Sequence, residues 1–342
     1  MAYHFRNLVF EGGGVKGIAY VGALQVLQEK EILRDIVRVG GTSAGAIMAV
    51  LLGLGYSLAE TSDVLKKLNF REFLDDSRGA IRDVNRLITE FGWYKGDFFR
   101  DWIGERIKTK TGNSESTFRD IYTAGKEQGL RELFFIGTNL STGFAEVFSY
   151  EHTPRMCIAD AVRISMSIPL FFASRRSPRG DVYVDGGLID NYPVKLFDRK
   201  KYVDTYFKIP PYYEEHNAQL TQDGRQLNPY VYNMETIGFR LDSAKEIAVF
   251  RDQAEPEHIG ISDLFSYSRA LVGAILNIQD SMHLHSDDWQ RTIYIDTRGV
   301  GTTDFDLDDG KKDELIGSGE KWTKKYFDEW YADPTLTFSN RP

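Results

Sequence analysis

The chain is poor in cysteine and histidine, and these shortages exclude several kinds of site. Its 342 residues include one cysteine, Cys157, which excludes an internal disulfide framework and suits a reducing compartment. Of the six histidines, only His283 and His285 stand close together, and two aspartates follow them. Two histidines at an expected helix end are more typical of a solvated terminus than of a metal site. We therefore expect neither a metal nor a cofactor.

Excess positive charge and an uninterrupted apolar span are also missing. Lys and Arg number 42 against 50 Asp and Glu, and the net charge of −8 does not suit permanent docking on nucleic acid or anionic lipid. Residues 39–59 carry no charge and are long enough to span a bilayer, but glycines, serines and a threonine dilute the stretch, so a buried helix fits better. No secretory leader precedes the first expected strand. We expect a cytoplasmic protein whose contact with membranes is peripheral and transient.

What the sequence does contain is a serine between glycines. Gly41-Thr42-Ser43-Ala44-Gly45 has the G-x-S-x-G form of a nucleophile elbow, a tight turn from strand to helix that exposes a serine hydroxyl. A short β-branched run precedes the motif and a compact apolar stretch, residues 46–52, follows it. Strand, turn and helix are the order that an elbow needs. The alternative is a serine that merely caps the following helix.

A second glycine cluster lies upstream. Gly12-Gly13-Gly14-Val15-Lys16-Gly17 follows an expected strand, residues 8–11, and the apolar residues after it repeat every third position, which predicts a helix that begins near Gly17. Such glycines leave backbone N–H groups unhindered beside a helix N-terminus, an arrangement that suits an oxyanion.

The same glycines also fit the G-x-G-x-x-G fingerprint of dinucleotide-binding proteins. That interpretation requires a carboxylate at the end of the second strand to hold a ribose. Here the expected second strand ends at Val39-Gly40-Gly41, with no carboxylate, and the chain has no G-x-x-x-x-G-K-[ST] phosphate loop. The sequence therefore disfavours nucleotide binding.

A third cluster follows a later strand. Val182-Tyr183-Val184 leads directly into Asp185-Gly186-Gly187, which on its own is typical of an ordinary turn. The three clusters in this order resemble the patatin-like phospholipase family, whose pattern is a Gly-Gly-Gly-x-[Arg/Lys]-Gly loop, then G-x-S-x-G, then Asp-Gly-[Gly/Ala]. The resemblance covers roughly residues 5–200 and includes Ser165-Met166-Ser167-Ile168-Pro169, Asn191 and Pro193. Glu11 stands where many members have aspartate.

This resemblance implies a three-layer α/β fold with a mostly parallel central sheet flanked by helices. It implies a catalytic domain over residues 5–200, which residues 201–342 continue with an insertion near 205–235. It also implies a Ser–Asp dyad that cleaves acyl esters of glycerophospholipids or lysophospholipids, with Ser43 as nucleophile and Asp185 as base. Because the carboxyl ends of parallel strands meet at one edge, we expect the two side chains within about 2.6–3.2 Å of each other.

The oxyanion of that reaction needs hydrogen-bond donors. We assign the backbone N–H groups of Gly13 and Gly14 to this role, because a β-carbon there would block the ester oxygen. Gly12 and Gly17 belong to the same loop. Lys16 is a nearby cation, and it could equally be a solvated lysine at the helix start.

The remaining sequence predicts elements without an obvious function. A capping box, Ser57-x-x-Glu60, opens one helix, and an apolar stripe within residues 98–107 marks the core face of another. Residues 133–138 and 145–148 are expected strands, residues 264–282 a long amphipathic helix, residues 293–295 a late strand and residues 311–331 a terminal helix. Residues 199–235, rich in proline and tyrosine, form either a cover over the site or a surface insertion, and we favour the insertion.

Two other functions remain as alternatives to the lipid hydrolase. An α/β-hydrolase esterase would pair Ser43 with His283 or His285, but its elbow usually follows several more strands. A nucleotide-binding regulatory module would use the glycine loop for phosphate. A catalytically silent scaffold is disfavoured because Ser43 and Asp185 are both present. Head group, oligomeric state and any activating partner are not encoded in readable motifs.

Overall fold

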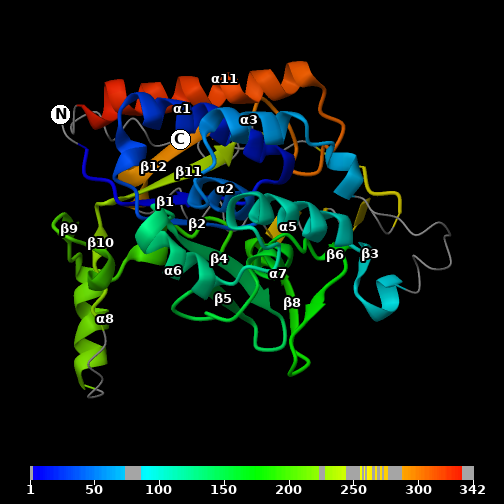
Figure 1. Ribbon diagram of the computed structural model, residues 1–342, viewed down its shortest axis with the longest axis horizontal. Coiled ribbons are helices and arrows are strands. Elements are labelled where there is room, and N and C mark those ends of the chain that lie inside the picture. The colour runs from blue at the N-terminus through cyan, green and yellow to red at the C-terminus, as the bar shows by residue number, and fades with distance from the viewer. Residues whose placement is uncertain are drawn as a thin grey trace.

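A central sheet organises the chain (Figure 1). Its strands are β1 (Asn7–Phe10), β2 (Arg38–Gly41), β4 (Glu132–Asn139), β5 (Phe144–Ser149), β7 (Arg175–Arg176), β8 (Val182–Asp185), β11 (Thr236–Asp242) and β12 (Thr292–Asp296). They are ordered β12-β11-β1-β2-β4-β8-β7, and β5 also pairs with β4. The pairs from β12 to β4 are parallel, whereas β5, β8 and β7 join in antiparallel fashion. The predicted mostly parallel sheet is confirmed.

The computed structural model describes residues 3–73, 86–222, 228–243 and 287–332, with short pieces between 255 and 275. Its helices are α1 (Tyr20–Glu29), α2 (Ala44–Gly53), α3 (Leu58–Lys66), α5 (Asp97–Thr111), α6 (Phe118–Gln128), α7 (Ile158–Ser165), α8 (Pro211–Gln222) and α11 (Asp309–Lys325). Two short strands, β3 (Gly92–Tyr94) and β6 (Leu170–Phe172), pair with each other beside the main sheet. Figure 1 shows α1, α3 and α11 together on one side of the sheet.

Both faces of the parallel strands are buried, as their apolar sequences require. Leu8 and Phe10 of β1 point into the main core, which the helices cover. Val9, between them, points to the opposite face and packs in a smaller cluster with Phe197 and Tyr202. The sheet is therefore the middle layer of three, in agreement with the expected architecture.

The described residues between 199 and 235 lie away from the predicted site. The segment contains β9 (Phe207–Lys208), α8 and β10 (Tyr232–Asn233), and α8 extends away from the body in Figure 1. Its contacts lie at the amino-terminal edge of the sheet, where Asp204 faces Arg6 at 3.6 Å, just before β1. Ser43 follows the carboxyl end of β2, at the opposite edge. The described part of this segment therefore does not act as a cover over Ser43, and its assignment as an insertion stays a prediction.

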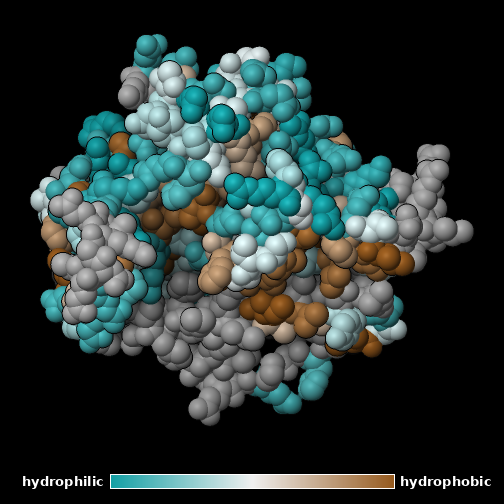
Figure 2. Space-filling model, turned by 90° about the horizontal axis from the view of Figure 1, so that it is seen from below, coloured by the Kyte–Doolittle hydropathy of each residue, from teal (hydrophilic) through white to brown (hydrophobic). Residues whose placement is uncertain are grey.

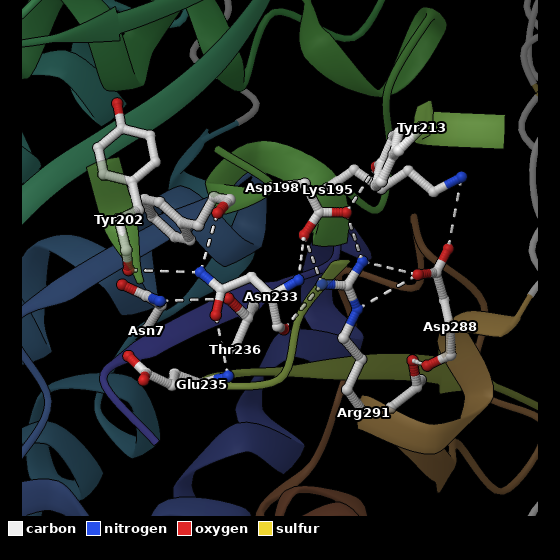
Figure 3. A network of polar contacts seen from close by, with 12 residues as sticks. Asn7, Lys195, Asp198, Tyr202, Tyr213, Asn233, Glu235, Thr236, Asp288 and Arg291 are labelled. Carbon is white, nitrogen blue, oxygen red and sulfur yellow. Dashed lines mark hydrogen bonds and ion pairs between the residues drawn. The ribbon is translucent and has the colours of Figure 1, made fainter. Parts of the chain in front are cut away.

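A buried ionic network joins α8 to the strands of the sheet (Figure 3). The guanidinium of Arg291 lies 2.6 Å from Asp198 and 2.7 Å from Asp288, and the Tyr213 hydroxyl on α8 donates to Asp198 at 2.7 Å. All three charged side chains are almost fully buried. Because removing one partner would leave a buried charge uncompensated, the network holds the start of β12, residue 198 and α8 as one unit.

Several smaller predictions are also confirmed. Ser57 and Glu60 form a complete capping box at the start of α3. On α5 the apolar stripe faces the core, and β4 and β5 form the expected hairpin. α11 ends in a turn of π-helix, Tyr326–Tyr331. Most of the helix expected over 264–282 lies outside the described residues.

Two further expectations concern single features. Cys157 is half-buried and immediately precedes α7. Among the helices that the structure describes, none is both long enough and apolar enough to cross a bilayer.

Candidate active site

Ser43 occupies a strained turn between β2 and α2. Its backbone angles, φ 53° and ψ −122°, lie in a region that residues other than glycine rarely adopt. The flanking glycines make the turn possible, since a β-carbon on Gly41 would lie 2.5 Å from the Gly45 carbonyl and one on Gly45 would lie 2.3 Å from the Phe10 carbonyl. The Ser43 side chain makes no capping hydrogen bond to α2, so the capping alternative does not describe it.

The backbone of the turn is held from two directions. The Ser43 N–H donates to the Ser165 hydroxyl at 2.9 Å, and the Thr42 hydroxyl donates to the Asp190 carbonyl at 2.9 Å. The Ser43 hydroxyl itself is directed toward the Met166 sulfur at 3.4 Å, a weak contact. The backbone of the nucleophile candidate is therefore firmly placed, and the contact of its hydroxyl with the Met166 sulfur is weak enough to be given up easily.

Asp185 is the last residue of β8. It lines the same cavity as Ser43, which is described below, although β8 does not run in the expected direction. β8 is antiparallel to β4, so the argument from parallel strand ends is wrong for this strand. Gly41 of β2 pairs with Phe135 of β4. Asp185 of β8 pairs with Gly137 of β4, which lies two residues farther along that strand. The carboxyl-terminal part of β4 extends beyond the end of β2. β8 pairs with this part in the antiparallel direction, so its last residue, Asp185, lies just past the end of β2.

The Asp185 carboxyl is buried and only half satisfied. One oxygen, Oδ1, accepts the Gly187 N–H at 2.7 Å, whereas Oδ2 has no hydrogen-bond partner among the described residues. Burial raises the pKa of Asp185 to about 7, and the Gly187 N–H and the nearby Ser43 hydroxyl oppose this shift more weakly. The carboxyl can therefore accept or hold a proton near neutral pH, and its free oxygen is available to do so.

The glycine loop lies against both of these residues. The Gly12 N–H donates to the Asn191 carbonyl at 3.0 Å, and the Asn191 side-chain amide donates back to the Gly12 carbonyl at 3.2 Å. Gly12 is thus not a free donor. In the part of the chain that the structure describes, no hydrogen bond engages the N–H groups of Gly13 and Gly14.

The reasons for glycine in this loop differ from the predicted one. A β-carbon on Gly12 would lie 2.4 Å from the Asn191 Oδ1 and 3.1 Å from the Ser43 β-carbon. One on Gly13 would point at Leu241, and one on Gly14 at the Thr302 carbonyl, 2.0 Å away. Gly14 also has a positive φ of 55°. Gly12 is therefore required by the close packing of the loop against Asn191 and Ser43, and Gly14 by the shape of the loop.

Gly17 and Lys16 have structural contacts. A β-carbon on Gly17 would press within 3.0 Å of the Ala44 side chain, so Gly17 allows the two motifs to pack closely. The Lys16 ammonium is almost fully buried and donates to the Leu241 carbonyl at 3.2 Å, at the end of β11. Lys16 is therefore not the solvated lysine of the alternative interpretation, since it anchors the loop to β11.

A small cavity brings the three motifs together. Its lining residues are Gly12, Gly13, Ser43, Ile168, Pro169, Asp185, Gly187, Leu188, Asn191 and Thr302. Its volume is about 20 Å³, which holds about one water molecule. Thr302 was missed by sequence reasoning because it follows the late strand β12 in a segment with no motif, and only the folded chain brings it to Gly14. No histidine that the structure describes lines this cavity, and His283 and His285 lie outside the described residues.

A short segment after α7 positions both candidate residues. Ser165 holds the Ser43 N–H through its hydroxyl, and the Ser167 carbonyl accepts the Asp185 N–H at 2.8 Å. The buried Arg163 fixes this segment, since its guanidinium donates to the Ser167 hydroxyl and to the carbonyls of Gly96 and Ala173. The sequence marked these residues only as part of the resemblance, because hydroxyl contacts over more than 100 positions leave no local signal.

We expect Ser165→Ala to lower kcat about tenfold with little change in KM. The variant leaves the buried Ser43 N–H without an acceptor, at a cost of about 1–3 kcal/mol, in a turn that is already strained. Ser116→Ala is the matched control, because the buried Ser116 hydroxyl contacts Thr111 and Asn113 and neither Ser43 nor Asp185, and its kcat should change less. Steady-state kinetics on a soluble ester and thermal unfolding check this, and an unchanged kcat in Ser165→Ala would contradict it.

Comparison with known proteins identifies similar chains. The family model described as patatin-like phospholipase matches residues 8–198. The uncharacterized protein YqhO of Bacillus subtilis is 29% identical over 336 residues, covering 94% of this chain and 98% of that protein. Lysophospholipase NTE1 of Candida glabrata is 27% identical over 188 residues, 55% of this chain but 9% of that protein. In structure the chain resembles VipD of Legionella pneumophila, with a TM-score of 0.59 at 17% identity, covering 96% of this chain and 67% of that one.

Proposed function

Because the chain belongs to the patatin-like phospholipase family, we propose that Ser43 and Asp185 form a dyad that hydrolyses acyl esters of glycerophospholipids or lysophospholipids. The observation that carries this proposal is the shared cavity, in which the hydroxyl of an elbow serine lies beside a buried carboxyl with one free oxygen. The relatives include lipid hydrolases, which supports the reaction class.

In the first half of the reaction, the ionised Asp185 removes the Ser43 proton while the serine oxygen attacks the ester carbonyl. The electron pair of the carbonyl moves to its oxygen, which becomes an oxyanion, and then returns as the bond to the leaving alcohol breaks. Asp185 delivers its proton to that alcohol. In the second half, Asp185 deprotonates a water molecule, which attacks the carbonyl of the acyl-Ser43 ester. As the bond to the serine oxygen breaks, Asp185 returns the proton to that oxygen, and a fatty acid is released.

The oxyanion would be stabilised by the N–H groups of Gly13 and Gly14. A preorganised donor of this kind contributes about 3–4 kcal/mol to the transition state. These donors matter more here than in a histidine triad, because a carboxylate is a weaker base than imidazole for a serine hydroxyl. The raised pKa of Asp185, about 7, narrows that difference.

We expect Gly14→Ala to lower kcat at least about tenfold. The new β-carbon overlaps the Thr302 carbonyl and occupies a backbone conformation with positive φ, so the loop must move and its donors with it. Gly112→Ala is the matched control, since Gly112 has φ 81° with open space around it, far from the loop in sequence. Kinetics and thermal unfolding of both variants separate the two effects. If the two variants lose the same thermal stability and Gly14→Ala keeps the kcat of the unmodified protein, the oxyanion assignment is contradicted.

Contact with lipid aggregates is part of this proposal. Figure 2 shows hydrophobic side chains gathered in patches among hydrophilic ones on the face seen from below. At the tip of the β4–β5 hairpin, at the carboxyl end of β4, Leu140 and Phe144 are 48% and 71% exposed. Exposed apolar side chains at this edge suit a transient contact that does not depend on net positive charge.

Product analysis tests the proposed reaction. The protein is incubated in ¹⁸O-labelled water with phospholipid, lysophospholipid and triacylglycerol that carry the same acyl chain, and the products are identified by mass spectrometry. We expect free fatty acid with one ¹⁸O atom from a glycerophospholipid or lysophospholipid. Release of no fatty acid from either, with or without detergent, would contradict the proposal.

A further inference from the structure

A second, larger cavity lies on the sheet face that carries Asp185. Its volume is about 790 Å³, within the range of small-molecule sites and far above that of the cavity at Ser43. On β4, Gly137 pairs with Asp185 on one side and with Glu146 on the other, and paired residues share a face. Glu146 lines the cavity, so this wall lies two strand spacings, roughly 10 Å, from Asp185.

The floor of this cavity is apolar. Phe148 of β5 and Ile164 of α7 are buried and line it together with Met156. Figure 1 shows α7, β5 and β8 as neighbours in this part of the fold. Glycine at position 137 allows Phe148 and Ile164 to pack directly over β4, because a β-carbon there would lie 2.5 Å from the Phe148 ring and 2.9 Å from Ile164. An acyl chain fits such a floor by the hydrophobic effect alone.

Arginines from two separate segments surround this floor. Arg155 is exposed and has no partner among the described residues, and Arg175 only approaches Asp97 and Asp160, each at 4.0 Å. Arg176 donates to one carbonyl, that of Gly180, at 3.3 Å. These guanidinium groups keep donors available in a chain whose net charge is −8.

The carboxylates in the same cavity are mostly engaged. Glu146 accepts hydrogen bonds from the Tyr183 hydroxyl at 2.9 Å and from the Asn139 amide at 2.8 Å. Asp160 accepts from Arg100 at 3.1 Å. Glu90 is the third carboxylate and is exposed. The three carboxylates and three arginines of the lining balance in formal charge, and it is the unused guanidinium donors of the arginines that favour an anion.

We propose that this cavity binds an anionic amphiphile, with its chain on the apolar floor and its head group held by Arg155, Arg175 and Arg176. Phosphate and carboxylate each present a pair of oxygens that a planar guanidinium group can bind through two parallel hydrogen bonds. A lysophospholipid and a free fatty acid are the two sources of this chemistry. The inference concerns binding and does not depend on the dyad.

Calorimetric titration of the Ser43→Ala protein tests this inference without turnover. The probes are lysophosphatidic acid, the fatty acid and the monoacylglycerol with one common acyl chain, each below its aggregation concentration. We expect one equivalent of an anionic probe to bind at least about tenfold more tightly than monoacylglycerol. Tighter binding of the lysophosphatidic acid assigns the head group to phosphate, and tighter binding of the fatty acid assigns it to carboxylate.

Arginine variants locate the binding. Arg175→Gln with Arg176→Gln, and Arg155→Gln separately, should each weaken the anionic probes at least about fivefold and leave monoacylglycerol unchanged. Arg119→Gln is the matched control, because Arg119 is exposed on α6 and does not line the cavity. Unchanged anion binding in these variants, or an equal loss for monoacylglycerol, would overturn the inference. Fluorophosphonate labelling in the same arginine variants carrying Ser43 reports separately on the dyad.

Discussion

Replacing Asp185 with asparagine is expected to lower turnover at least about a hundredfold. The amide keeps the size and shape of the carboxyl but cannot accept the Ser43 proton, and loss of a general base costs at least this much. The Gly187 N–H still finds an oxygen at 2.7 Å if the amide is oriented accordingly, so the loop should stay in place. Steady-state kinetics on a soluble ester measure the loss.

The pH dependence of the unmodified protein gives the same prediction a second readout. Asp185 must be ionised to act as a base, and its pKa is raised to about 7, so kcat/KM should rise with pH through about 7. The raised pKa also means that the folded state binds this proton more tightly than the unfolded state. Stability is therefore lost as pH rises from about 4 toward 7, and Asp185→Asn should be at least as stable as the unmodified protein at pH 8.

Histidine variants provide the control for this result. Each of the six histidines replaced by glutamine should leave substantial activity, because no described histidine lines the cavity. His283 and His285 are the most informative pair, since the triad alternative requires one of them. An active Asp185→Asn variant together with an inactive histidine variant would replace the dyad with a triad.

Ser43→Ala is expected to abolish ester hydrolysis with the fold intact. The hydroxyl makes only a weak contact with the Met166 sulfur and does not cap α2, so its loss removes little stability. The hydrogen bond that holds the turn uses the Ser43 N–H, which alanine retains. Residual hydrolysis is measured against buffer, and thermal unfolding confirms the fold. Turnover above a few per cent of the unmodified rate would assign the nucleophile to another residue.

The sequence predicted the local parts of the site because their signals are local. An elbow needs glycines within two positions of the serine, and the glycine loop is a run of consecutive glycines, so both motifs can be recognised without a fold. The positive φ of Ser43 and the close approaches at Gly41 and Gly45 are the physical reasons for that pattern. Short strand-like runs likewise predicted β4 and β5, and helical periodicity predicted α5.

The sequence did not predict how the parts meet. The direction of β8 depends on its pairing with the extension of β4, and no residue in β8 encodes whether a neighbour is parallel or antiparallel. Thr302 and Leu241 contact the glycine loop from more than 200 residues away in the sequence. Thr302 contributes a backbone carbonyl and Leu241 a carbonyl and an apolar side chain, groups that many other residues could supply. Such contacts are properties of the tertiary structure.

The central claim is that Asp185 activates Ser43, and the rate of fluorophosphonate labelling tests it most directly. The unmodified protein and Asp185→Asn are exposed to the probe, the labelled peptide is identified by mass spectrometry, and the labelling rate is followed over time. The proposed dyad predicts an adduct on Ser43 in the unmodified protein, formed at least about tenfold more slowly in Asp185→Asn. An adduct on another residue, or equal rates in the two proteins, would contradict it.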